Sequence, residues 1–169
     1  MIAPVQAGKV NYVFELVDTK LNKVLTDADL KIAHEKKLHM MAYDPALKEF
    51  QHVHPEFDGH VWKVELNFSV NANYWLWTQG ELAGDGSEFT SSTRLTVQGG
   101  APSWPSPRLT ETRAGSSGIS VVTLGAGKLV AGRMAMLTVK FSRNNGTPAE
   151  ITPYLGAFAH AVAVTDDGD

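Results

Sequence analysis

The chain has 169 residues, of which 43% are hydrophobic and 20% are charged, so it can bury a core of its own. Its net charge of −3 lacks the basic excess of a nucleic-acid surface, and we expect no nucleic-acid partner. The absence of cysteine excludes disulfides, thiolate metal sites and cysteine nucleophiles. No apolar run reaches the length of about 18 residues that a membrane span needs, so we expect none.

Short strands separated by turn residues dominate the sequence. Period-two alternation predicts strands over residues 9–18 and 61–68. Turn residues that flank the other segments predict further strands over 38–43, 50–54, 74–82 and 89–97. Residues 26–30 are expected to form a single turn, and residues 46–49 are too few for a helix that stands alone. Strands at roughly 8–12-residue spacing predict an all-β fold, an immunoglobulin-like or cupredoxin-like β-sandwich.

A proline- and glycine-rich stretch divides the chain. Residues 99–107, GGAPSWPSP, stop both sheet ladders and helices, and we expect a linker there. This predicts a β-sandwich domain over 8–98 and a second, shorter β unit over 108–169. In the second unit residues 110–118 are expected to be loose, and strands are expected over 119–124, 134–143 and 158–165. The two units repeat one another weakly, with His39 and His160 at equivalent places.

Histidine is concentrated in one segment. Five of the six histidines lie between His34 and His60. His52 and His54 stand at i and i+2, which places both imidazoles on one face of a strand. Pro55 then ends the strand because it has no backbone N–H.

The pairing of two strands decides whether these imidazoles meet others. If Tyr43 pairs with Phe50 across the loop between them, the two histidines of the second strand lie opposite Met41 and His39. Directly opposed Cβ atoms are about 4.5–5.5 Å apart. A slip by one residue would turn the set to the other face, so the predicted cluster depends on this register.

Three imidazoles and a thioether favour a transition metal. Imidazole suits copper, zinc and nickel, and a thioether adds a preference for Cu(I), so copper is expected ahead of zinc. Three histidines with a water also form a known zinc site. Glu56 and Asp58 are candidates to orient an imidazole from outside the metal's own ligands. The candidate metal ligands are His39, His52, His54, Met41 and His160, the last in this cluster only if the second unit packs against the first.

The same residues also have ordinary structural explanations. A single histidine is usually a surface or hydrogen-bonded residue, and we favour this explanation for His34 and His60. The thioether of Met41 would then simply pack in the core. The aromatic run 74–77 fits sandwich packing better than a platform for a sugar or peptide.

Residues 37–56, KLHMMAYDPALKEFQHVHPE, resemble a segment of bacterial exported proteins. Their pattern runs Lys-x-His-Leu, a few apolar residues, then Asp-Leu-x-x-Phe-x-His-x-His-Pro. Residues 151–160 resemble a second segment, Tyr-Leu-Gly-Ala-x-Gly-His-x-Val-Ala, which another His-x-His-Pro follows in those proteins. They are often described as uncharacterised secreted proteins and are sometimes associated with copper or heavy-metal handling.

This resemblance implies export to the periplasm or the extracellular space and carries forward His39, His52, His54 and His160 as candidate ligands. The chain departs from the pattern at Ala159, where glycine is usual, and it lacks the second His-x-His-Pro, which puts a second complete site in doubt. The first eight residues have neither the charged nor the apolar region of a signal peptide, so we expect an initiator Met in place of any leader.

Three functions follow from these residues. The first, which we expect, is a non-enzymatic copper or zinc carrier, buffer or chaperone, whose ligand imidazoles must be neutral to bind. The second is an immunoglobulin-like interaction module that binds another envelope protein. The third is a metalloenzyme with an open position on three histidines, which needs an acid or base and a pocket nearby. The sequence contains no phosphate loop or serine elbow.

Overall fold

The computed structural model describes residues 3–103, 113–116, 119–124, 130–153, 157–159 and 161–163. Two compact units divide the chain, Met1–Ser106 with Ala161–Asp169, and Pro107–His160. The described residues form strands and one 3-10 turn but no α-helix, which confirms the predicted all-β fold. Within this described part, no helix has the length and apolar character to cross a membrane.

The strands of the first unit form a large sheet and two smaller ones. The large sheet has the order β1-β10-β9-β5-β6, with β11 added to β9; a second sheet has the order β2-β8-β7, and β3 pairs with β4. Their bounds are β1 Val5–Gln6, β2 Gly8–Phe14, β3 Leu16–Asp18, β4 Lys23–Leu25, β5 Leu38–Tyr43, β6 Phe50–Val53, β7 Glu56–Phe57, β8 Trp62–Phe68, β9 Val70–Glu81, β10 Glu88–Gln98 and β11 Ala101–Pro102.

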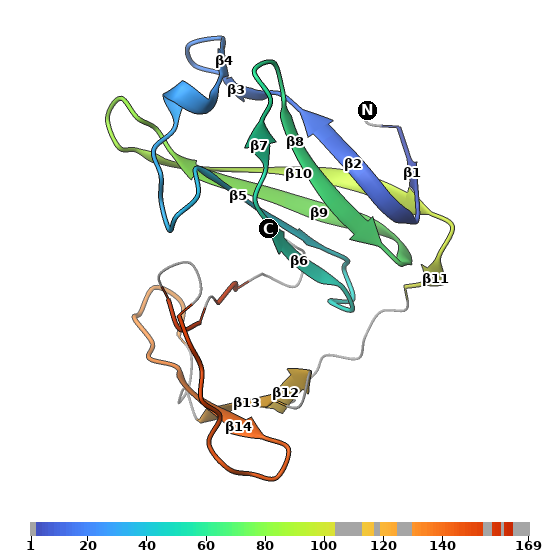
Figure 1. Cartoon of the computed structure of the whole chain (residues 1–169), viewed down its shortest axis with the longest axis vertical. Helices are drawn as coiled ribbons and strands as arrows, with labels where there is room; N and C mark the ends of the chain where they lie inside the picture. Colours follow the sequence, from blue (N-terminus) through green and yellow to red (C-terminus); the bar gives the residue numbers. More distant parts are fainter. Residues whose placement is uncertain are drawn as a thin grey trace. The chain divides into compact units, whose positions relative to one another are not determined.

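The two larger sheets of this unit pack face to face as a sandwich. Alternate side chains of each strand point inward, and Met40 of β5, Leu76 of β9 and Leu66 of β8 share one buried cluster. In Figure 1 β2 and β8 cross in front of β9 and β10. Burial of every second residue is the physical reason why the alternating sequence predicts these strands.

A smaller cluster closes one end of the sandwich. Trp62 is 1% exposed and packs with Leu16, Leu25, Leu30 and Leu38. Its indole N–H donates a hydrogen bond of 3.0 Å to the carbonyl of Leu25. The expected turn over residues 26–30 is present as a 3-10 turn, η1 (Asp27–Asp29). This end of the molecule carries the loop that reaches the histidines.

The second unit contains a three-stranded antiparallel sheet, β12 (Arg113–Ser116), β13 (Ile119–Leu124) and β14 (Thr138–Arg143). The strand over 119–124 is confirmed, whereas the loose segment expected over 110–118 is wrong at residues 113–116, because pairing with β13 overrides their weak strand propensity. The strand expected over 158–165 is absent from residues 158–159 and 161–163. There Phe158 and Val162 are 64% and 44% exposed, so no sheet buries them.

The predicted linker also contributes to a sheet. The short strand β11 lies inside residues 99–107 and pairs in parallel with the start of β9. The N–H of Ala101 donates to the carbonyl of Ser69 at 2.8 Å. Proline at position 102 is tolerated because this two-residue strand lies at the margin of the sheet, where its missing N–H is not needed.

Candidate metal centre

The loop between β5 and β6 is organised around one buried carboxylate. Asp44 is 0% exposed. It accepts hydrogen bonds from the backbone N–H groups of Ala46 at 3.1 Å and Glu49 at 2.8 Å, and from the hydroxyl of Ser103 at 2.9 Å. Three donors on one buried carboxylate fix the length and shape of this loop, and the loop sets the pairing of the two strands.

Glu49, at the end of the same loop, ties the hairpin to the β8–β9 corner. Its carboxylate accepts the backbone N–H of Ser69 at 3.0 and 3.2 Å and also the hydroxyls of Ser69 and Tyr74. Burial, and then the bond to Glu49, raises the pKa of Tyr74. Tyr74 therefore stays a hydroxyl donor at neutral pH, and the hairpin is anchored at both ends of its loop.

The predicted register of the hairpin is confirmed. Tyr43 pairs with Phe50, and Met41 pairs with His52. On the other side of β5, Met41 lies opposite Trp77 of β9. Met40 and Ala42, the alternate residues of β5, belong to the buried core. His39, Met41 and His52 therefore lie on the outer face of the large sheet.

Three imidazoles meet on this outer face. The rings of His39 and His54 have centroids 4.9 Å apart, those of His52 and His54 5.0 Å, and those of His39 and His52 5.5 Å. One ring nitrogen from each lies within 4.8 Å of the other two. All three residues are half-buried. After Pro55 the chain enters β7, which pairs with β8 of the other sheet, and His54 remains beside His39 and His52.

These separations match the requirements of one tetrahedral ion. Two nitrogens that bind such an ion at about 2.05 Å lie about 3.3 Å apart, and their ring centroids lie about 5 Å apart. The Nδ1 atom of His39 is 3.3 Å from Nε2 of His52. The donor set is neutral nitrogen, which suits copper, zinc or nickel rather than calcium or magnesium. The three histidines therefore fit a transition metal ion.

A backbone carbonyl orients the first of these rings. The Nε2 atom of His39 is 3.0 Å from the carbonyl oxygen of Ala33. A carbonyl oxygen only accepts, so Nε2 carries the proton and Nδ1 keeps its lone pair for the cluster. This is the arrangement in which a second hydrogen bond fixes the tautomer of a metal-binding histidine. The sequence gives no signal for it, because the partner is a main-chain atom.

The loop that supplies this carbonyl is itself anchored. Both the N–H and the hydroxyl of Thr26 donate to the carboxylate of Asp29 at 2.9 Å. The hydrogen bond from the Lys23 ammonium, followed by those from Thr26, lowers the pKa of Asp29 to about 2. Further along, the N–H of Lys31 donates to the carbonyl of Glu81 at 2.9 Å. These bonds hold the loop beside the end of β9 and keep it close to β5.

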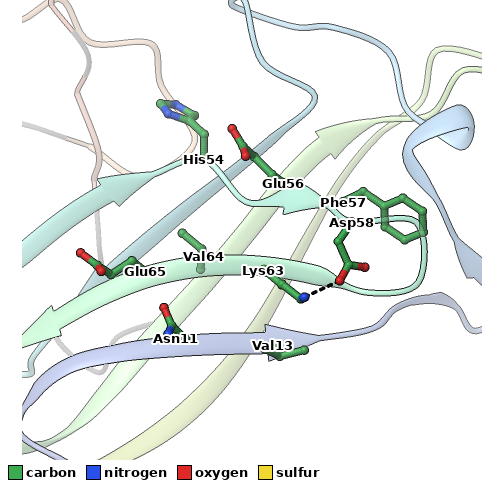
Figure 2. A pocket seen from close by; sticks show the side chains of 9 residues that line it. All are labelled: Asn11, Val13, His54, Glu56, Phe57, Asp58, Lys63, Val64 and Glu65. Carbon is green, nitrogen blue, oxygen red and sulfur yellow. Dashed lines mark ion pairs between the residues drawn. The ribbon is translucent and has the colours of Figure 1, made fainter.

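A groove of about 610 Å³ opens beside the cluster on the β2-β8-β7 side, and His54 lines it. Figure 2 shows the side chain of Glu56 next to that of His54 at one rim of the groove. Asp58, further along, forms an ion pair with Lys63 that lowers the pKa of Asp58, together with backbone hydrogen bonds. Of the two candidate carboxylates, Glu56 therefore lies beside His54, whereas Asp58 is paired with Lys63.

The remaining sequence candidates have different positions. Met41 is 5% exposed and lies directly opposite His52. His34 is exposed, with its ring centroid 6.3 Å from that of His39. His60 is exposed in the turn before β8, and His160 lies outside the described residues. Comparison of the chain with protein-family models, with curated proteins and with solved structures finds no match.

Proposed function

We propose that this protein is an exported transition-metal-binding protein that carries, buffers or delivers copper, or else zinc. The observation that supports it is the convergence of His39, His52 and His54, whose ligand nitrogens lie within 4.8 Å of one another. Ordinary surface histidines need no such convergence. Nor does packing explain it, because the cluster stands on the outer face of the sheet rather than in the core.

The preference for copper over zinc rests on the neighbouring thioether. Met41 shares the outer face with the imidazoles and pairs with His52 across the two strands. Thioether sulfur is a soft ligand that favours Cu(I), whereas zinc is satisfied by imidazole and water. A site that has both imidazole nitrogens and a nearby thioether suits copper, which changes between Cu(I) and Cu(II).

Carriage rather than catalysis is supported by the surroundings of the cluster. The three imidazoles are half-buried, and one of them lines an open groove, so an ion can enter and leave without unfolding the sandwich. The hairpin that holds them is rigid because buried hydrogen bonds anchor its loop. The proposed compartment, periplasmic or extracellular, rests on the resemblance of residues 37–56 to exported proteins, and the proposed partner besides the ion is another envelope protein.

Calorimetric titration of the metal-free protein at about pH 7.5 with Cu(II), Cu(I) and Zn(II) tests this proposal. We expect binding of one equivalent with a Kd below about 1 μM, that is, a binding free energy beyond about −8 kcal/mol. The triple variant His39→Ala, His52→Ala, His54→Ala should lose this binding. The variant His60→Ala, which removes an exposed histidine in a turn, should bind as the wild type does.

Equal and weak binding by the wild type and the triple variant would contradict the proposal. The chain would then be better explained as an interaction module, and the search would turn to a protein partner. Tight binding that survives in the triple variant would place the ion elsewhere in the chain and would contradict the assignment of these ligands.

A further inference from the structure

We propose that His34 is the fourth ligand of a divalent ion bound by His39, His52 and His54. The inference rests on the proposed metal-binding function and goes beyond the three histidines that already converge. Three nitrogens leave a four-coordinate Cu(II) or Zn(II) ion one ligand short, and a fourth must come from a water or from the protein.

The position of the ring is the first argument. The centroid of the His34 ring is 6.3 Å from that of His39, and the two rings meet edge to face at 76°. Rings that share one tetrahedral ion have centroids about 5.2 Å apart, so the His34 and His39 rings lie about 1 Å beyond the separation of two such ligands. His34 is exposed, so a change of its side-chain rotamer meets little resistance from packing.

The backbone at His34 is the second argument. His34 and the next residue, Glu35, have φ angles of +49° and +67°. They are the central residues of a tight turn closed by hydrogen bonds between Ala33 and Lys36, at 2.8 and 3.1 Å. Asparagine and glycine usually occupy such a turn, and histidine also tolerates a positive φ better than most side chains do. The turn presents the imidazole of His34 to the ring of His39.

The link between this turn and the cluster is the third argument. The carbonyl of Ala33, which starts the turn, accepts the hydrogen bond from Nε2 of His39. When His39 shifts to bind an ion through Nδ1, this hydrogen bond therefore couples its shift to the turn that carries His34. Met41 is a different kind of donor: its thioether suits Cu(I), whereas a divalent ion favours the imidazole nitrogen of His34.

Pulsed electron paramagnetic resonance of the Cu(II)-loaded full chain tests the inference, because it counts the imidazoles bound to copper. We expect four in the wild type and three in the variant His34→Asn. Asparagine is the matched replacement since it tolerates a positive φ and keeps the turn. We also expect the Cu(II) affinity of His34→Asn to fall about tenfold or more, and that of the control His60→Asn to stay unchanged.

Two results would overturn the inference, and they differ from each other. An equal imidazole count and equal Cu(II) affinity in the wild type and His34→Asn would show that His34 is no ligand, while the proposed function would stand. A wild type with no imidazole on copper would overturn the proposed function and this inference with it. The melting temperature of metal-free His34→Asn, which we expect to equal or exceed that of the wild type, separates lost ligation from lost folding.

Discussion

At the scale of single residues, the two nitrogens of His39 have different tasks. Nε2 donates to the carbonyl of Ala33 at 3.0 Å, and Nδ1 faces Nε2 of His52 at 3.3 Å. Because Nδ1 of His39 carries a lone pair, the hydrogen between the two rings belongs to Nε2 of His52, and an ion takes its place. His52 must then move this proton to its Nδ1 or release it, whereas His39 gives up no proton.

This assignment predicts which nitrogen of His39 carries the proton. In metal-free protein at neutral pH we expect the Nε2–H form, because Ala33 offers only an acceptor. Long-range ¹H–¹⁵N correlation spectra distinguish the two tautomers. Addition of Zn(II) should then shift the Nδ1 resonance of His39, while the resonances of His60, which lies apart from the cluster, should not move. The Nδ1–H form in the metal-free protein would contradict the geometry.

At the scale of elements, the β5–β6 hairpin places the site, and Asp44 places the hairpin. Replacement of Asp44 by Ala leaves the buried N–H group of Ala46 and the partly buried N–H group of Glu49 without their acceptor. Each such loss costs about 1–3 kcal/mol, so we expect the free energy of unfolding to fall by about 2–4 kcal/mol. Metal affinity should fall too, because a loop of different shape allows the strands to slip and separates His52 from His39.

Urea unfolding and the titration described above measure both effects. The control is Asp85→Ala, which removes a carboxylate that accepts from Ser87 in an exposed turn. We expect that change to alter the free energy of unfolding by less than about 0.5–1 kcal/mol and to leave metal affinity intact. An Asp44→Ala protein with unchanged stability and unchanged affinity would show that the loop does not set the register.

The elements also show how far the sequence carries a prediction. Alternation over residues 61–68 predicts β8, and the register of Tyr43 with Phe50 follows from strand parity across a six-residue loop. Partners distant in the chain are not visible in this way. Residues 113–116 are paired by β13, and residues 101–102 by β9. For the same reason the carbonyl of Ala33, a main-chain acceptor, leaves no trace in the pattern of side chains.

At the scale of the whole molecule, the sandwich separates stability from function. The core lies between the sheets, whereas the imidazoles stand on the outer face of β5 and just beyond β6. The histidines therefore contribute little to the hydrophobic core, and the loop anchors at Asp44 and Glu49 hold their strands in place. A protein built in this way should remain folded without an ion, as the proposed carrier function requires.

This separation predicts that the ion adds stability without being needed for folding. The metal-free protein should unfold cooperatively, and Zn(II) at about 100 times its Kd should add about 2.7 kcal/mol, or roughly 5–10 °C in melting temperature. Fluorescence reports this unfolding because Trp62, Trp75 and Trp77 belong to strands of the first unit.

The gain should disappear toward about pH 5, because a protonated imidazole has no lone pair for the metal and affinity falls as pH falls. The triple variant His39→Ala, His52→Ala, His54→Ala should show no gain at either pH. A gain that persists at about pH 5 would indicate carboxylate ligands rather than imidazoles. A metal-free protein that does not fold would indicate that the ion is a structural part of the sandwich, and the chain would then not be a carrier.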